Sequence, residues 1–171
     1  MIDFRRLSGW TQEDDVAITE GEPLPYGEVP RNLIWRRKSD FVVAYDGDRP
    51  VGHAAVLTVE VRSGIVGRLQ VAGLGSVLVA PSYRGRGVGS QLVQQVLEMV
   101  RERELSWTLL LCLDERVSFY ARLGWKAVPG PVTIEQPDSI RVDLPVGLRM
   151  MAFGPQVEWL SGVIEVIGLP F

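Results

Sequence analysis

Residues 77–90 read Val-Leu-Val-Ala-Pro-Ser-Tyr-Arg-Gly-Arg-Gly-Val-Gly-Ser, and this stretch decides the fold. The run 74–79 is apolar at nearly every position, as in a strand that is covered on both faces. Gly85, Gly87 and Gly89 allow backbone conformations that other residues avoid, so a tight turn follows the strand. Apolar residues then recur at the 3.6-residue period of an amphipathic helix: Leu92, Val93, Val96, Leu97 and Val100.

The alternation of strands and helices continues downstream. Residues 108–112 have the composition of a second buried strand, and Asp114 is placed to cap a short helix that runs to about Arg122. Gly124 is expected to end that helix. Strand, helix, strand and helix in this order predict an α/β (α+β) fold, in which the first helix crosses between two neighbouring strands.

Further strands are expected on both sides of this unit. Their expected positions are 41–45, 51–62, 125–128 and 148–153. Residues 46–48 form a hairpin turn between the first two, and residues 68–72 lead towards the strand at 74–79. The apolar stretch 157–171 is expected to pack onto the domain.

The first forty residues carry weaker signals. Thr11 is placed as the N-cap of a short helix with acidic residues in its first turn. Residues 21–27 are expected to form a loop, because two prolines and two glycines cannot propagate a helix. Residues 32–37 are expected to form a second short helix.

The composition is typical of one domain that spans residues 1–171, with 46% hydrophobic and 23% charged residues. A formal net charge of −3 makes the chain a poor candidate for a nucleic-acid binder, which needs a basic excess. A single cysteine, Cys112, excludes an internal disulfide and a cysteine-based zinc site. No apolar run approaches the roughly 20 residues of a membrane span, and charges interrupt residues 1–10, so we expect a cytoplasmic protein.

The glycine-rich turn is suited to a diphosphate. It opens into a helix, so free N–H groups and the positive end of the helix dipole point at one place, beside Arg84 and Arg86. A Walker P-loop is excluded, because Gly89 is followed by Ser90-Gln91 rather than by Lys and Ser or Thr. The glycine spacing and the preceding proline do not suit a Rossmann fingerprint. The pattern Arg-x-x-Gly-x-Gly, filled by Arg84, Gly87 and Gly89, remains.

This pattern resembles the pyrophosphate loop of the GNAT superfamily of acetyl-CoA-dependent N-acetyltransferases. The matching positions of the longer family run Pro-x-Tyr-Arg-Gly-x-Gly-Val-Gly are Pro81, Tyr83, Arg84, Gly85, Gly87, Val88 and Gly89. Residues 118–125, Ser-Phe-Tyr-Ala-Arg-Leu-Gly-Trp, are similar to the family motif Phe-Tyr-x-x-x-Gly-Phe, with Trp as the last residue. The resemblance implies a single-domain GNAT-like fold, with a mixed, mostly antiparallel sheet flanked by helices.

The resemblance also implies the chemistry. Acetyl-CoA would be the co-substrate, without a metal, and the acceptor would be a primary amine of a small molecule. Backbone N–H groups at Leu78 and Val79 would hold the pantetheine arm and the acetyl oxygen, and Tyr120 would be the general acid for the leaving thiolate. The pyrophosphate would be bound by the residues of the turn: Arg84, Gly85, Arg86, Gly87, Val88, Gly89 and Ser90.

The sequence departs from the family pattern where many members carry a general base. That base is a Glu on the strand that leads into the turn, whereas residues 72–77 contain no carboxylate. The remaining candidates are Glu60, His53, Asp46, the C-terminal carboxylate, a relay through water, and an acceptor that arrives as the neutral amine. If the activity has been lost, the chain is a non-catalytic acyl-CoA-binding module or sensor.

A narrower resemblance points to the aminoglycoside 2'-N-acetyltransferases. It rests on residues 50–56, 125, 128–133, 142–145 and 171. Those enzymes end in an acidic tail that binds a cationic sugar, whereas Leu169 stands at the corresponding acidic position here. A homodimer is expected from the habit of the family.

Other residues that could suggest a site are expected to serve packing. His53, the one histidine, lies in an apolar strand, where a core histidine is more common than a catalytic base. Cys112 ends a buried strand and is expected to be inert. Trp107, Trp125 and Trp159 are expected in the core rather than around a cofactor.

Overall fold

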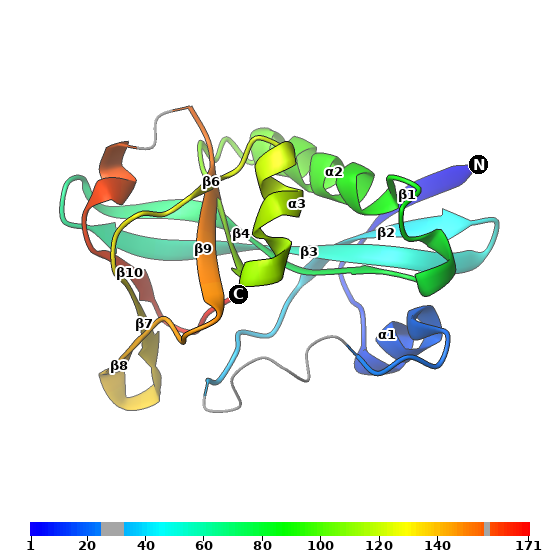
Figure 1. Cartoon of the computed structure of the whole chain (residues 1–171), viewed down its shortest axis with the longest axis horizontal. Coiled ribbons are helices and arrows are strands. Elements are labelled where there is room, and N and C mark those ends of the chain that lie inside the picture. Colours follow the sequence, from blue (N-terminus) through cyan, green and yellow to red (C-terminus); the bar gives the residue numbers. More distant parts are fainter. Residues whose placement is uncertain (25–32, 156–157) are drawn as a thin grey trace.

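The computed structural model describes residues 1–24, 33–155 and 158–171. The described strands form one sheet (Figure 1). They are β1 (Ile2–Leu7), β2 (Asp40–Asp46), β3 (Arg49–Ser63), β4 (Gly67–Val79), β5 (Thr108–Leu113), β6 (Lys126–Ala127), β7 (Val132–Gln136), β8 (Ile140–Asp143), β9 (Leu148–Phe153) and β10 (Ile164–Ile167). The α-helices are α1 (Gln12–Thr19), α2 (Val88–Glu102) and α3 (Val117–Arg122).

The sheet is mixed and mostly antiparallel. Its main path runs β6-β9-β5-β4-β3-β10-β7-β8, and β1 joins it through β2. Strand β2 pairs with residues 49–56 of β3, and β10 pairs with residues 60–63, so β3 supports two neighbours along one edge. Within the described residues the parallel pairs are β4–β5 and β10–β7. The predicted fold class is confirmed.

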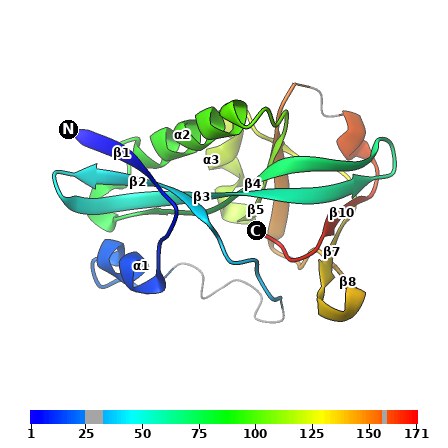
Figure 2. The same ribbon diagram turned by 180° about the vertical axis from the view of Figure 1, so that it is seen from behind.

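Helices α1 and α2 lie on opposite sides of the sheet (Figures 1 and 2). The apolar face of α2 packs on β3 and β4, where Leu92 and Val96 are fully buried. Burying one such side chain contributes roughly 1.5–3 kcal/mol, so this face is a main support of the core. The predicted helix and its crossover between the parallel strands β4 and β5 are confirmed. Among the described helices, none has the length and apolar character needed to cross a bilayer.

Strand β4 is the element from which the site is built. It is continuous, so the predicted lead-in 68–72 and the predicted strand 74–79 belong to one element. Its pairing with β3 shifts by one residue between His53 and Ala55, and Ser76 has a φ of 51°. These two features define a β-bulge, which bends the strand at this point.

The N-terminus contains a strand that the sequence pattern did not predict. Strand β1 pairs antiparallel with β2 at the edge of the sheet. Ile2 and Phe4 alternate as expected of a strand, but Arg5 and Arg6 interrupt the alternation after one period. The pairing with β2, rather than the local pattern, makes this segment a strand.

Helix α1 begins as predicted. Asp14 N–H donates to the Thr11 hydroxyl at 3.2 Å, and Thr11 N–H donates to the Asp14 carboxylate at 2.8 Å, which together form a capping box. The predicted loop 21–27 is confirmed as far as Leu24, and its remaining residues lie outside the described part of the chain.

The helix predicted over residues 32–37 is wrong over its described part, which excludes Asn32. The backbone of this segment bonds to distant residues instead. Ile34 N–H donates to the side chain of Gln136 at 2.8 Å, and Arg36 N–H donates to a backbone carbonyl of the C-terminal segment at 2.7 Å. Tertiary hydrogen bonds thus replace those of a helix.

Asp114 does not cap a helix, contrary to the prediction. It begins a 3-10 turn, Asp114–Arg116, that precedes α3, and its carboxylate accepts a hydrogen bond from Arg149 Nε on β9 at 2.6 Å. The arginine on the neighbouring strand therefore takes the carboxylate that would have capped the helix. Gly124, with a φ of 88°, follows α3 as predicted.

The C-terminal part extends the sheet further than predicted. The expected strand 148–153 is confirmed as β9, whereas the one at 125–128 shrinks to the two residues of β6. Strands β7 and β8 form a hairpin that the surrounding prolines concealed in the sequence. The apolar C-terminal stretch packs onto the sheet as expected, because β10 inserts between β3 and β7.

Gly73 on β4 is expected not to tolerate a side chain. A Cβ atom there would lie 2.6 Å from Cγ of the buried Phe171 ring. We expect Gly73→Ala to lower the free energy of unfolding by about 1–3 kcal/mol, because overpacking displaces side chains from their preferred rotamers. Gly64→Ala, where nothing lies within 4 Å, is the control and should change stability by less than about 1 kcal/mol. Urea denaturation measures both, and equal stabilities would contradict this packing.

Candidate functional site

Strands β4 and β5 part close to the bulge. They pair from Ala72 to Leu74 of β4, and β5 then continues alongside β9. Beyond Leu74 the edge of β4 that faced β5 has no strand partner in the described structure. Leu78 and Val79, which were predicted to contact the cofactor, both lie in this part of β4. Unpaired backbone groups at a strand edge can bind an extended ligand.

The glycine-rich turn ends at an uncapped helix start. Gly85 and Gly87 have φ values of 74° and 82°, the left-handed region that favours glycine. Gly87 is the N-cap of α2 and makes no side-chain cap, and Gln91 N–H donates to its carbonyl at 3.0 Å. The N–H groups of residues 88–90 therefore have no partner within the helix. Together with the helix dipole they form a site suited to an anion.

The two arginines of the turn are held differently. Arg84 Nη1 lies 2.8 Å from Glu22 Oε2, and Arg84 Nε donates to the Val79 carbonyl at 3.2 Å. The Arg86 guanidinium lies 5.3 Å from the centre of the Tyr83 ring and makes no ion pair with the described residues. Arg84 thus fastens the turn to the end of β4, while the charge of Arg86 remains available to an anion.

Glu20 joins the end of α1 to the same turn. Its carboxylate accepts hydrogen bonds from the hydroxyl and the N–H of Ser82, the latter at 2.9 Å, and pairs with Arg49 on β3. These bonds, led by that of the Ser82 hydroxyl, lower the pKa of Glu20. The carboxylate therefore stays charged at neutral pH and holds the turn against α1.

Tyr120 lies on α3, shortly after β5. It is 8% exposed, and its ring centre lies 4.9 Å from that of Phe119 and 5.9 Å from that of Trp125. Burial raises the pKa of the phenol, and the neighbouring Cys112 adds to the shift. The phenol is therefore protonated throughout the neutral range, so it can donate a proton but cannot serve as a base there.

The face of β4 opposite α2 carries no side chain next to the bulge. Leu74 packs in the cluster under α2, so Gly73 and Gly75 face the other side. A Cβ atom at Gly75 would lie 3.0 Å from Lys38 Cε and 3.3 Å from the backbone carbonyl carbon of Phe171. Lys38 and Phe171 thus cover the two glycines where β4 leaves β5.

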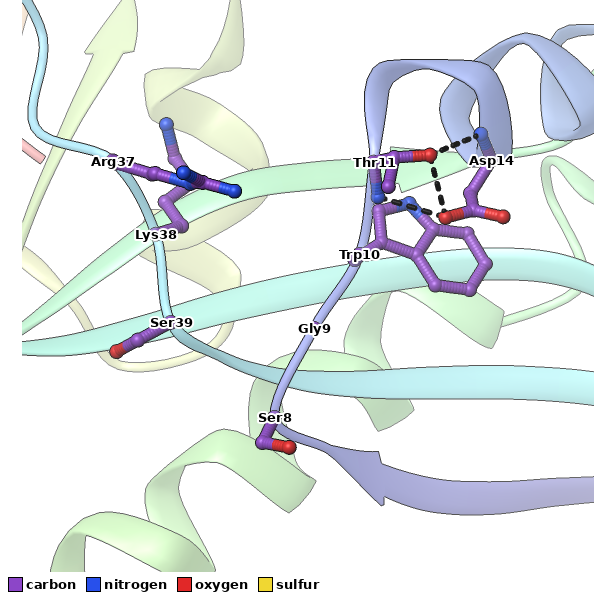
Figure 3. Close-up of a pocket in the computed structure, with 8 residues that line it drawn as sticks. All are labelled: Ser8, Gly9, Trp10, Thr11, Asp14, Arg37, Lys38 and Ser39. Atoms are coloured by element: carbon purple, nitrogen blue, oxygen red, sulfur yellow. Dashed lines mark hydrogen bonds between the residues drawn. The ribbon is translucent and has the colours of Figure 1, made fainter.

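A cavity of about 430 Å³ opens beside Lys38 (Figure 3). It is lined by Ser8, Gly9, Trp10, Thr11, Asp14, Arg37, Lys38 and Ser39. Arg37 and Lys38 lie on one side of it, and Trp10, Thr11 and Asp14 on the other (Figure 3). The cavity therefore separates the loop before α1 from the segment before β2.

His53 is 1% exposed, which confirms its predicted place in the core. Its ring centre lies 5.4 Å from that of Trp10 and 5.8 Å from that of Phe41. His53 Nε2 lies 2.6 Å from Asp15 Oδ1, but neither ring nitrogen makes a hydrogen bond of normal direction. The same Asp15 oxygen accepts from Trp10 Nε1 at 2.8 Å. A side chain so enclosed cannot contact an acceptor molecule.

Two other candidate bases are engaged away from the bulge. Glu60 Oε1 lies 2.7 Å from Arg68 Nη1, in the part of the β3–β4 hairpin remote from the bulge. Asp46 Oδ2 accepts a hydrogen bond from the Tyr83 hydroxyl at 2.7 Å. The structure therefore brings neither carboxylate to the place where β4 and β5 part.

The sequence pattern did not single out Arg37 and Lys38, or the loop that faces them. The sequence does contain a feature that could have pointed to them, because residues 36–38 are three consecutive basic side chains in a chain of net negative charge. The sequence could not show which residues these basic side chains lie near, since Gly75 and Trp10 are distant from them in sequence. Their proximity comes from the pairing of β2 with β1 and β3.

The expected packing roles of Cys112 and Trp125 are confirmed, with 7% and 2% exposure. Trp107 is half-buried against the core, and the side chain of Trp159 lies outside the described structure. Burial raises the pKa of the Cys112 thiol to about 11, with a smaller contribution from Asp114. Among residues 1–24, 33–155 and 158–171, no three His, Cys, Asp or Glu side chains are grouped as metal ligands.

Cys112 is therefore expected to resist alkylation. With a pKa of about 11 against about 8.5 for a free thiol, the thiolate fraction at neutral pH falls by about a hundredfold or more. We expect iodoacetamide to label the folded protein at least a hundred times more slowly than the urea-unfolded protein, as measured by intact mass. Similar rates in the two states would show that the thiol is accessible and ionised.

The model of the acetyltransferase (GNAT) family matches residues 6–125 of the chain. A glucosamine 6-phosphate N-acetyltransferase from Trypanosoma brucei brucei is 29% identical over 113 residues, which cover 64% of this chain and 76% of that protein.

Two solved structures share the fold. Escherichia coli ElaA aligns with a TM-score of 0.56 and 19% identity, over 89% of this chain and 99% of that chain. A GNAT family N-acetyltransferase from Escherichia coli in complex with CoA aligns with a TM-score of 0.51 and 20% identity, over 76% and 68%. Because the family model covers more than half of its residues, the chain belongs to the acetyltransferase (GNAT) family and is an N-acetyltransferase.

Proposed function

We propose that the protein transfers the acetyl group of acetyl-CoA to a primary amine of a small molecule. The observation that carries this proposal is the open edge of β4 beyond Leu74, which leads into the uncapped start of α2. Tyr120, buried and protonated, follows on α3. An extended arm, a diphosphate and a leaving thiolate each have a complementary partner in this arrangement. Acetyl-CoA supplies all three groups.

The residues present fit coenzyme A. The diphosphate would lie at residues 84–90, where backbone N–H groups and the Arg86 guanidinium supply donors and positive charge. Nothing lies within 4 Å of a Cβ atom built on Gly85 or Gly87, so the approach to this backbone is open. The pantetheine arm would follow β4, with the N–H group of Val79 as a donor, whereas the N–H of Leu78 points to β3, as does that of Ala80, which donates to the Val51 carbonyl at 2.9 Å.

The proposed reaction moves one proton from the amine to the thiol. Acetyl-CoA supplies a thioester carbonyl carbon, to which the neutral amine forms a C–N bond while the C–S bond breaks and sulfur takes the electron pair. Tyr120 gives its phenolic proton to this sulfur. The amine loses a proton to water, and Tyr120 regains one from water, so atoms and charge balance.

A second candidate function is a non-catalytic acyl-CoA-binding module. The observation that favours it is the stretch 72–77 of β4, which has no carboxylate and presents Gly73 and Gly75 to the acceptor side. Such a module would bind the cofactor at the glycine-rich turn but would not transfer its acetyl group. The two functions therefore differ in amine-dependent thiol release and agree in cofactor binding.

The acceptor class proposed is wider than the aminoglycosides. Residues 50–56 and 128–133 favour an aminoglycoside by resemblance, but Arg37 and Lys38 place positive charge on the acceptor side, where it repels a polycation. The trypanosomal relative is named for a phosphorylated amino sugar. Cytoplasmic location and a homodimer stay predictions.

Tyr120→Phe tests the proposed general acid. We expect kcat to fall by about a hundredfold or more, the usual contribution of a positioned acid, while CoA affinity changes less than about twofold. Tyr45→Phe, a half-buried tyrosine on β2, is the matched control. Thiol release is followed with amino sugars, polyamines, peptide N-termini and aminoglycosides, and CoA binding by calorimetry.

The outcomes separate the two candidate functions. Amine-dependent release that Tyr120→Phe abolishes supports the transferase, and unchanged release removes Tyr120 from the acid role. Saturable CoA binding without turnover on any amine supports the binding module. A chain that binds no CoA would contradict both functions.

Arg86→Gln tests the cofactor turn. We expect it to weaken CoA binding by about tenfold or more, because one charge-assisted contact to a phosphate contributes about 1.5–3 kcal/mol. Arg101→Gln, on the exposed surface near the other end of α2, is the matched control and should bind as the unmodified protein does. Calorimetry at low and high salt measures both, and equal affinities would place the diphosphate elsewhere.

A further inference from the structure

A cationic cavity adjoins the proposed site on its acceptor side, and the inference drawn from it rests on the proposed function. Lys38 Cε lies 3.0 Å from where a Cβ atom of Gly75 would be, one residue before the Ser76 bulge. Helix α2 covers the opposite face of β4. The side chain of Lys38 therefore connects this cavity to the point at which β4 leaves β5.

The basic residues of the cavity make no ion pair in the described structure. Neither Lys38 nor Arg37 makes an ion pair or hydrogen bond with another residue of 1–24, 33–155 or 158–171. Asp14 is the acid among the lining residues, and its carboxylate accepts from the Thr11 N–H and hydroxyl, each at 2.8 Å. The cavity therefore carries a net positive charge, because Arg37 and Lys38 face one carboxylate, that of Asp14, which is already hydrogen-bonded to Thr11.

The Lys38 ammonium is partly removed from water. Burial lowers its pKa, and the charge of Asp15 opposes this shift. Asp15 is itself occupied, since it accepts a hydrogen bond from Trp10 Nε1 at 2.8 Å and lies 2.6 Å from His53 Nε2. A desolvated cation without a close partner is unfavourable, and a bound anion offsets that cost.

We propose that this cavity binds an anionic group, a phosphate or a carboxylate, that the acceptor amine carries. The guanidinium of Arg37 offers a planar fork for two oxygens, and Lys38 adds a point charge beside it. The volume of about 430 Å³ is that of a small-molecule site. With its anion between Arg37 and Lys38, the acceptor extends its amine towards the bulge at Ser76.

Pairs of acceptors that differ in one anion test this proposal. Glucosamine 6-phosphate is compared with glucosamine, and an amino acid with its amide, by kcat/KM from thiol release. We expect the anionic member of at least one pair to be preferred by tenfold or more. A preference in the first pair identifies phosphate, and one in the second identifies carboxylate.

Lys38→Met and Arg37→Gln should bring this ratio of kcat/KM values close to one. Methionine keeps the unbranched stem that packs over Gly75 and removes the charge, and thermal unfolding verifies that each variant folds. The chain contains one other lysine, the exposed Lys126 on β6, so Lys126→Met is the matched control. It should leave the ratio unchanged.

A second measurement does not depend on turnover. Protein labelled with ¹⁵N-lysine gives two backbone amide signals, from Lys38 and Lys126. Titration with inorganic phosphate or acetate, at constant ionic strength set with chloride, should shift the Lys38 signal saturably and leave that of Lys126 in place. The shift should be absent in Arg37→Gln.

The inference and the proposed function can fail separately. A saturable shift at Lys38 without turnover of any amine keeps the anion site and removes the transferase. If the protein acetylates amines without preferring the anionic acceptors, and the amide signal of Lys38 does not move, the proposed transferase function stands. The proposed anion site is then overturned. Equal shifts of both lysine signals also overturn it, because they show a non-specific effect of the ions.

Discussion

The bulge at Ser76 is the constraint on which the rest of the molecule depends. A regular β4 would continue its ladder with β5 past Leu74, and the edge between them would be closed. Because the strand bends, its edge stays open while α2 still returns the chain to β5, which pairs parallel with β4. The turn with the start of α2 follows directly at the end of this open edge.

The elements that carry the proposed cofactor side could be predicted from the sequence, because their determinants are local. The glycines at 85 and 87, the helix that follows and Tyr120 in its own motif each depend on neighbours within a few positions. The surroundings of Lys38, on the proposed acceptor side, could not be predicted. Lys38 approaches Gly75 through the sheet, and the helix expected at 32–37 is replaced by a bond to Gln136, which a local pattern does not contain.

The two faces of β4 divide its roles. Leu74 faces α2 and contributes to the core, whereas Gly73 and Gly75 have no side chains on the other face. That absence lets the Phe171 ring approach Gly73 at a distance that a Cβ atom would prevent, and lets Lys38 approach Gly75 at a distance that a Cβ atom would crowd. Strand β4 thus stabilises the fold through one face and shapes the acceptor side through the other.

Helix α1 has eight residues and touches both halves of the site. At its start, Thr11 and Asp14 line the cavity proposed to bind the acceptor, and beyond its end Glu20 accepts a hydrogen bond from Ser82 of the turn proposed to bind the cofactor. A shift of α1 as a unit would therefore move both proposed binding surfaces together. Thermodynamic linkage then makes the effect mutual: to the extent that coenzyme A tightens acceptor binding through α1, the acceptor tightens coenzyme A by the same factor.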